Sequence, residues 1–188
     1  MEVPLFPLRT VLFPGGPLPL RIFEQRYLDM ISSCLKRDEP FGVVLIRSGS
    51  EVGSAEVYDS GTLARITDWY QGSDGLLGIT ATGTDRFRIR SSSRQPDGLL
   101  IGDVEILPAE TLAPMPDDFR PLARILAGVL DDLGRLYEDL DKRYDDASWV
   151  GYRFAEILPI DAKHKQDFLE MTDPLLRLRS IRSLLESE

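Results

Sequence analysis

Residues 4–30 have the sequence PLFPLRTVLFPGGPLPLRIFEQRYLDM, an apolar run interrupted by prolines and glycines. Proline fixes φ at about −65° and glycine permits tight bends, so this segment predicts an irregular first strand. The residues that shape it are Pro4, Pro7, Pro14, Gly15 and Gly16. The apolar residues between them, which we expect in the core, are Leu5, Phe6, Leu12 and Phe13.

A predicted helix begins at the end of this segment. No glycine or proline occurs from Glu24 to Lys36, and apolar side chains recur there at three- and four-residue spacings. They are Tyr27, Leu28, Ile31, Cys34 and Leu35. This periodicity gives the helix one apolar stripe, so we expect it to pack against a sheet.

The sequence up to about residue 112 predicts short strands separated by turn residues. Two polar loops with glycine, 71–75 and 95–98, are of the kind that closes hairpins. Several short strands with one helix predict a small, closed or nearly closed β-barrel. The expected strands are 41–46, 61–70, 76–82, 86–90 and 98–107.

Arginine alternates with apolar residues from Arg86 to Arg90. In a strand this order places Phe87 and Ile89 on one face and three guanidinium groups on the other. The arginine face is either a stripe that binds anions or nucleic acid, or the solvated side of a half-buried strand. We favour the solvated side, because nearby aspartates can neutralise the arginines. They are Asp85, Asp97 and Asp103.

Residues 108–118 form a proline-bearing connector, after which the apolar period changes from two to about 3.6. We therefore predict two units, a β-barrel at 1–112 and a helical bundle at 113–188. Four helices are expected in the second unit. They are a long amphipathic helix from Phe119 to Tyr137, one through Trp149 to Leu158 capped by Ser148, one capped by Asp161, and one that begins at Asp173 and Pro174.

The composition excludes several classes of protein. The 188 residues include one histidine, His164, and one cysteine, Cys34, too few for a four-ligand Cys/His zinc site or an internal disulfide. The formal charge of −9 disfavours nucleic acid as a partner. Glu2 and the early prolines do not fit a signal peptide, and no membrane helix is expected near the start of the chain. We expect a cytoplasmic protein without membrane contact.

The sequence contains no recognisable catalytic or phosphate-binding motif of the forms GxxxxGK[ST], GxGxxG or GxSxG. His164 lies in a polar first turn that we expect to face solvent. Cys34 lies on the apolar stripe of the first helix, so we expect a buried, inert thiol. Counting does not exclude a Ser/Lys dyad, but no spacing supports one. The carboxylates of residues 138–146 lack calcium-loop spacing and predict a solvated surface.

Residues 4–30 resemble the signature of the Lon protease amino-terminal domain family. Two further parts of the chain fit the same family, residues 61–66 with 83–89 and residues 155–159 with 165–178. The resemblance implies an α+β fold, with a PUA-like small β-barrel and one packed helix followed by a carboxy-terminal helical bundle. This fold agrees with the periodicity of the two halves.

In Lon proteases this region is thought to recognise substrates, ahead of an ATPase module and a Ser/Lys peptidase module. The sequence ends at Glu188, before either module could begin. We therefore expect polypeptide binding without enzymatic activity, and no catalytic residue, cofactor or metal. The expected partners are unfolded or apolar polypeptide segments and a separate ATPase or protease.

The expected binding surface lies at the start of the first helix and at the end of a strand. Aromatic side chains beside a methionine and a few charges suit contact with unfolded polypeptide without strict sequence choice. The candidates are Glu24, Gln25, Arg26, Tyr27, Met30, Trp69 and Tyr70. Two alternatives stay open, a module that binds RNA or a modified base and a hydrolase with an unrecognised site. The excess of 18 arginines over 4 lysines favours RNA, whereas the net charge opposes it.

Overall fold

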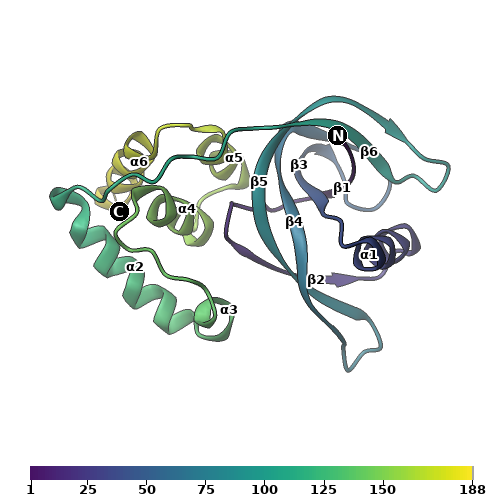
Figure 1. Ribbon diagram of the computed structural model, residues 1–188, viewed down its shortest axis with the longest axis horizontal. Coiled ribbons are helices and arrows are strands. Elements are labelled where there is room, and N and C mark those ends of the chain that lie inside the picture. The colour runs from purple at the N-terminus through teal and green to yellow at the C-terminus, as the bar shows by residue number, and fades with distance from the viewer. Residues whose placement is uncertain (188) are drawn as a thin grey trace. The chain divides into compact units, whose positions relative to one another are not determined.

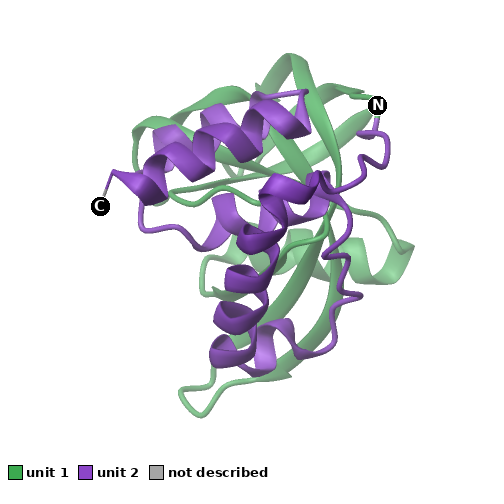
Figure 2. Cartoon of the chain, turned by 90° about the vertical axis from the view of Figure 1, so that its left-hand side faces the viewer, with its two compact units in different colours: residues 1–108 green, residues 109–188 purple. Residues whose placement is uncertain are grey.

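The structure is a computed structural model that describes residues 1–187. The chain divides into two compact units, residues 1–108 and 109–188, drawn green and purple in Figure 2. The first is strand-rich and the second helical, which confirms the predicted α+β class. The division falls at 108/109, four residues before the predicted 112/113, and Glu110 accepts hydrogen bonds from side chains of the helical unit.

The strand-rich unit contains, in chain order, β1 (Glu2–Leu8), β2 (Pro17–Ile22), α1 (Gln25–Arg37), β3 (Phe41–Gly49), β4 (Ala55–Gln71), β5 (Leu77–Arg94) and β6 (Leu100–Ile106). The helical unit contains the 3-10 turn η1 (Asp117–Phe119), α2 (Arg120–Leu133), α3 (Arg135–Glu138), α4 (Ala147–Ile157), α5 (Ala162–Glu170) and α6 (Pro174–Glu186).

The strands pair in the order β2-β5-β4-β3-β1-β6 (Figure 1). β1 runs parallel to β3, and the other pairings are antiparallel. β6 pairs with β5 as well as with β1, so five strands form a closed ring of pairings. Within residues 1–187, β2 pairs only with β5, which makes it an edge strand.

The proline-rich start of the chain forms two regular strands instead of one irregular strand. β1 ends at Leu8, the chain bends at Gly15, whose φ is 74°, and β2 begins at Pro17. A positive φ favours glycine because glycine has no Cβ. The apolar residues predicted for the core are all buried, namely Leu5, Phe6, Leu12 and Phe13.

β5 is one continuous strand, so the prediction of two short strands on either side of Gly83 is wrong. A Cβ at Gly83 would collide with the backbone carbonyl of Phe13. The N–H of Gly83 donates to the carbonyl of Gly16 at 2.9 Å, and its carbonyl accepts from the N–H of Gly15 at 2.8 Å. Gly83 therefore permits close approach of two chain segments and does not end the strand.

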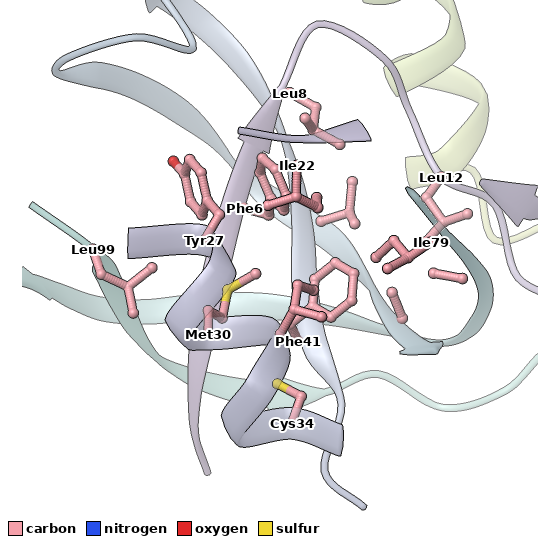
Figure 3. Close-up of a cluster of buried hydrophobic side chains, with 14 residues drawn as sticks. Phe6, Leu8, Leu12, Ile22, Tyr27, Met30, Cys34, Phe41, Ile79 and Leu99 are labelled. Atoms are coloured by element: carbon pink, nitrogen blue, oxygen red, sulfur yellow. The ribbon is translucent and has the colours of Figure 1, made fainter. Parts of the chain in front are cut away.

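α1 packs its apolar stripe on the sheet, as predicted, except that Leu35 is 42% exposed. Tyr27, Met30 and Cys34 extend from α1 into a cluster with Phe6 and Phe41 (Figure 3). The rings of Phe6 and Tyr27 stack with centroids 4.0 Å apart and an interplanar angle of 10°. Full burial of one such large apolar side chain contributes about 1.5–3 kcal/mol, so this contact fixes the position of the helix.

The alternation from Arg86 to Arg90 departs from the prediction at its first residue. Arg86 is buried, so the face is not a stripe of three solvated guanidinium groups. Its partner in the register is Thr62, whose buried hydroxyl donates to the carbonyl of Leu12 at 2.6 Å. The segment that contains Leu12 thus covers this part of the sheet. Arg90 is exposed and lies 3.3 Å from Glu105.

The first long helix of the helical unit is broken. α2 ends at Leu133, and Gly134, with a φ of 65°, separates it from α3. A right-handed helix needs a negative φ at every residue, so the predicted single helix from Phe119 to Tyr137 is wrong. Phe119 and Tyr137 are buried as expected, whereas Leu133 is exposed.

Asp161 and Asp173 cap α5 and α6, as predicted, because each carboxylate accepts hydrogen bonds from backbone N–H groups of the first turn. Ser148 does not cap α4. Asp146 is the cap, with its carboxylate 3.0 Å from the backbone nitrogen of Ser148. The hydroxyl of Ser148 instead donates to Glu110.

A buried ion pair joins the segments of the helical unit. Glu110 accepts hydrogen bonds from both terminal nitrogens of Arg177 and from the hydroxyls of Ser148 and Tyr152. Arg177 is fully buried and also donates to two backbone carbonyls, at 3.1 and 2.6 Å. Burial alone would raise the pKa of Glu110, but the hydrogen bonds from Arg177, Ser148 and Tyr152 outweigh it and lower that pKa below its usual value.

Candidate functional site

A groove of about 290 Å³ follows β2 in the strand-rich unit, and we call it the β2 groove. Every residue from Leu18 to Glu24 lines it, so it extends along most of this edge strand. The other side is formed by β1, by the loop after β1 and by the start of α1. The lining residues are Phe6, Leu8, Arg9, Thr10, Leu18, Pro19, Leu20, Arg21, Ile22, Phe23, Glu24, Tyr27 and Glu51.

The floor of the β2 groove is apolar because the core reaches the surface there. The stacked rings of Phe6 and Tyr27 line it, and Leu18 and Leu20 are only partly buried against the core. Phe23, directly after β2, is 61% exposed. An apolar side chain from another molecule would gain about 1.5–3 kcal/mol by full burial on such a floor.

Charges on the rim of the groove have partners within the protein. Arg21 pairs with Asp74, and Glu24 lies 2.9 Å from Arg26. Because positive and negative groups alternate and are compensated, the rim does not favour a ligand of one sign. The charged residues of the rim are Arg9, Arg21, Glu24 and Glu51.

Arg26 connects three chain segments next to the groove. Its Nη1 donates to the carbonyl of Gly98 at 3.0 Å and its Nη2 to the carbonyl of Glu51 at 3.2 Å. The guanidinium carbon lies 4.8 Å from the centroid of the Tyr27 ring. The sequence predicted Arg26 as an exposed contact, but its side chain is largely buried and holds Tyr27 and the loop with Glu51 in place.

Two of the predicted site residues, Glu24 and Tyr27, line the β2 groove. Gln25 is exposed at the start of α1. Tyr27 and Met30 are only 5% and 3% exposed, so the expectation that both face solvent is wrong. Both lie on the apolar stripe, which α1 directs into the core. Figure 3 shows the Tyr27 ring beside Phe6 with its hydroxyl directed away from the cluster.

Trp69 and Tyr70, at the end of β4, are 62% and 50% exposed but point to opposite faces of the sheet. Tyr70 covers Gly78, where a Cβ would collide with its ring. Trp69 pairs in register with Ile79, which pairs with Leu20 of the groove. Residues paired in this way share a face, so Trp69 lies on the same face as Leu20. The two aromatic residues therefore cannot contact one ligand from the same face.

Sequence reasoning did not single out Leu18, Leu20 and Phe23, which line the β2 groove. Their segment has an apolar pattern typical of core, and no charge marks it. A signal was present in Pro17 and Pro19, since prolines two residues apart in a strand are confined to an edge. Apolar residues beside such prolines lie where the core meets the surface.

The single cysteine and the single histidine are in environments typical of structural residues. Burial raises the pKa of the Cys34 thiol to about 11, which keeps it protonated at neutral pH. His164 is exposed, with Nδ1 2.8 Å from the carboxylate of the capping residue Asp161. No group of three or more metal-ligating side chains converges within residues 1–187. No helix in that range has the length and apolar composition needed to cross a membrane.

The family model described as the ATP-dependent protease La (LON) substrate-binding domain matches residues 2–187. The solved structure of a Lon N-terminal domain protein from Xanthomonas campestris is 34% identical and superposes with a TM-score of 0.80, covering 97% of this chain and 98% of that one. The N-terminal domain of the Mycobacterium avium complex Lon protease is 19% identical, with a TM-score of 0.66 over 96% of each chain, and is similar in fold.

Curated relatives are longer than this chain. The Lon protease of Anaeromyxobacter dehalogenans is 25% identical over 197 residues, which cover 97% of this chain and 23% of that protein. Protein cereblon of Danio rerio is 31% identical over 119 residues, covering 61% of this chain and 27% of that protein. This chain spans about a quarter of the length of the curated relatives that it matches.

Proposed function

This chain belongs to the family of ATP-dependent protease La (LON) substrate-binding domains, and from that premise we propose that it is a non-enzymatic module that binds apolar segments of unfolded polypeptides in the β2 groove. The β2 groove is the observation that carries the proposal. It combines an open apolar floor with a compensated charged rim, which suits segments that share apolar character but not sequence or charge.

The binding energy that such a site needs is small. A micromolar dissociation constant corresponds to about −8 kcal/mol, and one well-buried anchor supplies about 2 kcal/mol or more. The exposed side chains of Phe23 and of Trp69, which lies on the same sheet face as Leu20, offer contacts beyond the groove floor. Two or three such anchors would give weak, adaptable binding.

We include in the proposal a separate ATPase or protease that receives the bound segment. Its support is the naming of the curated relatives, which are Lon proteases about four times as long as this chain. Neither the chain's own thiol nor its imidazole is placed as a nucleophile or base, which supports the non-enzymatic part.

We also assign the strand-rich unit to the PUA-like barrels. The closed ring of pairings through β6 supports this assignment, as does the single helix packed on the sheet. The RNA-binding alternative is not favoured, because Arg86 is buried and Arg90 pairs with Glu105. Both residues would have to face a phosphate backbone in that function.

The test compares two glutamate substitutions at exposed apolar residues. Phe23→Glu changes a groove residue, and Leu112→Glu, at a leucine that is 75% exposed in the helical unit, is the matched control. The probe is a reduced and carboxymethylated protein labelled with a fluorophore, titrated by fluorescence anisotropy. We expect Phe23→Glu to weaken binding about tenfold, because it replaces an apolar contact beside the groove floor with a charge that the bound segment would desolvate, and Leu112→Glu to leave it unchanged. Absence of saturable binding, or equal loss in both variants, would overturn the proposal.

A further inference from the structure

β2 is hydrogen-bonded to another strand along only one of its edges within residues 1–187. In an antiparallel pair, alternate residues direct both backbone groups at the partner strand. Pro17 and Pro19 have no N–H and cannot be these residues. Leu18 and the alternate residues after it, Leu20 and Ile22, therefore bond to β5. The hydrogen bond from the N–H of Gly83 to the carbonyl of Gly16, at 2.9 Å, follows the same alternation.

Pro17, Pro19 and Arg21 therefore direct their backbone groups away from β5. Together they present three carbonyl oxygens but one N–H, that of Arg21, so this edge accepts more hydrogen bonds than it can donate. The partial negative charge of the carbonyls complements the N–H groups of an extended chain laid beside them, although the two missing N–H groups reduce the number of hydrogen bonds that this edge can make.

The same asymmetry argues against a second copy of this chain as the occupant. Two β2 edges laid side by side would place carbonyl oxygens opposite carbonyl oxygens, with few donors between them. An unfolded segment of another protein has an N–H at every residue except proline. Its N–H groups can therefore donate to the three carbonyls of this edge, while its own carbonyls opposite Pro17 and Pro19 meet no donor there.

The β2 groove lies along this edge, with Phe6 and Leu8 of β1 among its lining residues. An extended segment beside β2 would direct every second side chain toward the sheet face that carries Leu18 and Leu20. Backbone recognition by β2 and side-chain recognition by the floor would then act on one bound segment.

We propose that the β2 groove binds its polypeptide as an added β-strand, with N–H groups of the bound segment donating to the carbonyls of Pro17, Pro19 and Arg21. This proposal rests on the proposed function and specifies its substrate as an extended segment with free N–H groups at alternate positions and apolar side chains at alternate positions. Segments with proline at the donating positions are excluded.

Backbone N-methylation tests this mode of binding. Three versions of a nine-residue peptide of alternating leucine and threonine are compared, one unmodified, one N-methylated at every leucine and one N-methylated at every threonine. In an added strand, N–H groups of one set face β2 and those of the other face away. We expect one methylated peptide to bind about tenfold or more weakly and the other to bind within about twofold of the unmodified peptide.

The outcomes separate this proposal from the proposed function. Equal affinity of the two methylated peptides, with saturable binding that Phe23→Glu weakens, would overturn strand addition and leave the groove as a polypeptide site. Absence of saturable binding by the unmodified peptide and by the unfolded protein probe would overturn both.

Amide exchange of Arg21 provides a second measurement on the unmodified full chain. Its N–H is the outward donor of β2, so we expect the unmodified peptide to slow its hydrogen exchange about tenfold, as measured by NMR. The amide of Gly128, in the helical unit, is the control and should not change. Peptide binding without slower exchange at Arg21 would count against the added strand.

Discussion

The interiors of the two units differ in the side chains that they bury completely. In the strand-rich unit these include Phe13 and Phe41, whereas in the helical unit the largest are Arg153 and Arg177. Apolar burial is non-directional and tolerates small changes in geometry. A buried charge stabilises a fold only while its partner and hydrogen bonds are in place. The stability of the helical unit should therefore depend on a few bonds, chiefly those of Glu110.

This difference also bears on where a binding surface can form. The apolar interior of the strand-rich unit reaches solvent at the β2 groove without exposing an unpaired charge. A hollow of about 630 Å³ in the helical unit is lined in part by Arg120 and Arg143, which pair with Asp117 and Asp141. An apolar segment entering that hollow would have to desolvate those ion pairs.

Among substitutions of charged residues, the largest expected effect is that of Arg177→Met. It would leave Glu110 buried without its charged partner, which costs about 3–5 kcal/mol in the free energy of unfolding. Each unit contains one of the two tryptophans, so a Trp69→Phe background leaves Trp149 as the reporter of the helical unit. The measurement is urea denaturation followed by Trp149 fluorescence.

A double variant shows whether the loss comes from the unpaired carboxylate. Adding Glu110→Leu to Arg177→Met removes both charges and should restore at least half of the lost stability, since apolar pairs of similar volume often replace buried ion pairs without loss. A loss below about 1 kcal/mol in the single variant would mean that this ion pair does not hold the helical unit together.

The free energy of unfolding of the helical unit should decrease at acid pH because Glu110 becomes protonated there. Its pKa in the folded chain is lowered, chiefly by the hydrogen bonds from Arg177 that outweigh burial, so its contribution is present above the unfolded pKa of about 4.3. The contribution is lost as the pH falls through the lower folded pKa. We expect wild type to exceed Glu110→Gln by about 2 kcal/mol at pH 7 and this difference to shrink below about pH 4.

A matched change in the apolar interior sharpens the contrast. Phe41→Ala, at a fully buried position, should lower the stability of the strand-rich unit by about 3–5 kcal/mol both at pH 7 and at pH 4. The reactivity of the buried Cys34 thiol with a disulfide reagent, corrected for its thiolate fraction at each pH, reports opening of this unit.

A difference between wild type and Glu110→Gln that does not change with pH would contradict the assigned role of the Glu110 charge.

Apolar periodicity predicted the elements whose packing depends on neighbouring residues. It failed where a segment distant in the sequence determines burial or hydrogen bonding. The stripe of α1 and the cap at Asp173 are properties of neighbouring residues, and both are confirmed. Arg86 is buried because another segment covers it, and the partners of Glu110 follow it by 38 residues or more. Such contacts leave no period in the sequence.

The candidate site was predicted in part for the same reason. Glu24 and Tyr27 were predicted because they lie at the start of the first helix, and both line the β2 groove, whereas the burial of Met30 depends on the sheet beneath α1. Alternation along a strand could have shown that Trp69 and Tyr70 point to opposite faces. That Leu20 belongs to a groove required the pairing of β2 with β5.

The smallest expected effect is a change of sign between two glycine-to-alanine substitutions, one in each unit. A Cβ at Gly42 would lie 2.7 Å from Leu5 Cδ2 and 2.9 Å from Phe87 Cζ, so Gly42→Ala should destabilise the tightly packed strand-rich unit by about 1–3 kcal/mol. A Cβ at Gly128, inside α2, would meet nothing within 4 Å, and alanine is favoured over glycine in a helix by about 0.8–1 kcal/mol. Gly128→Ala should therefore stabilise the helical unit by up to that amount in Trp149-monitored denaturation. If both substitutions changed the free energy of unfolding in the same direction, the packing around these two glycines would not differ between the units. The two units would then differ in their buried side chains but not at these glycines.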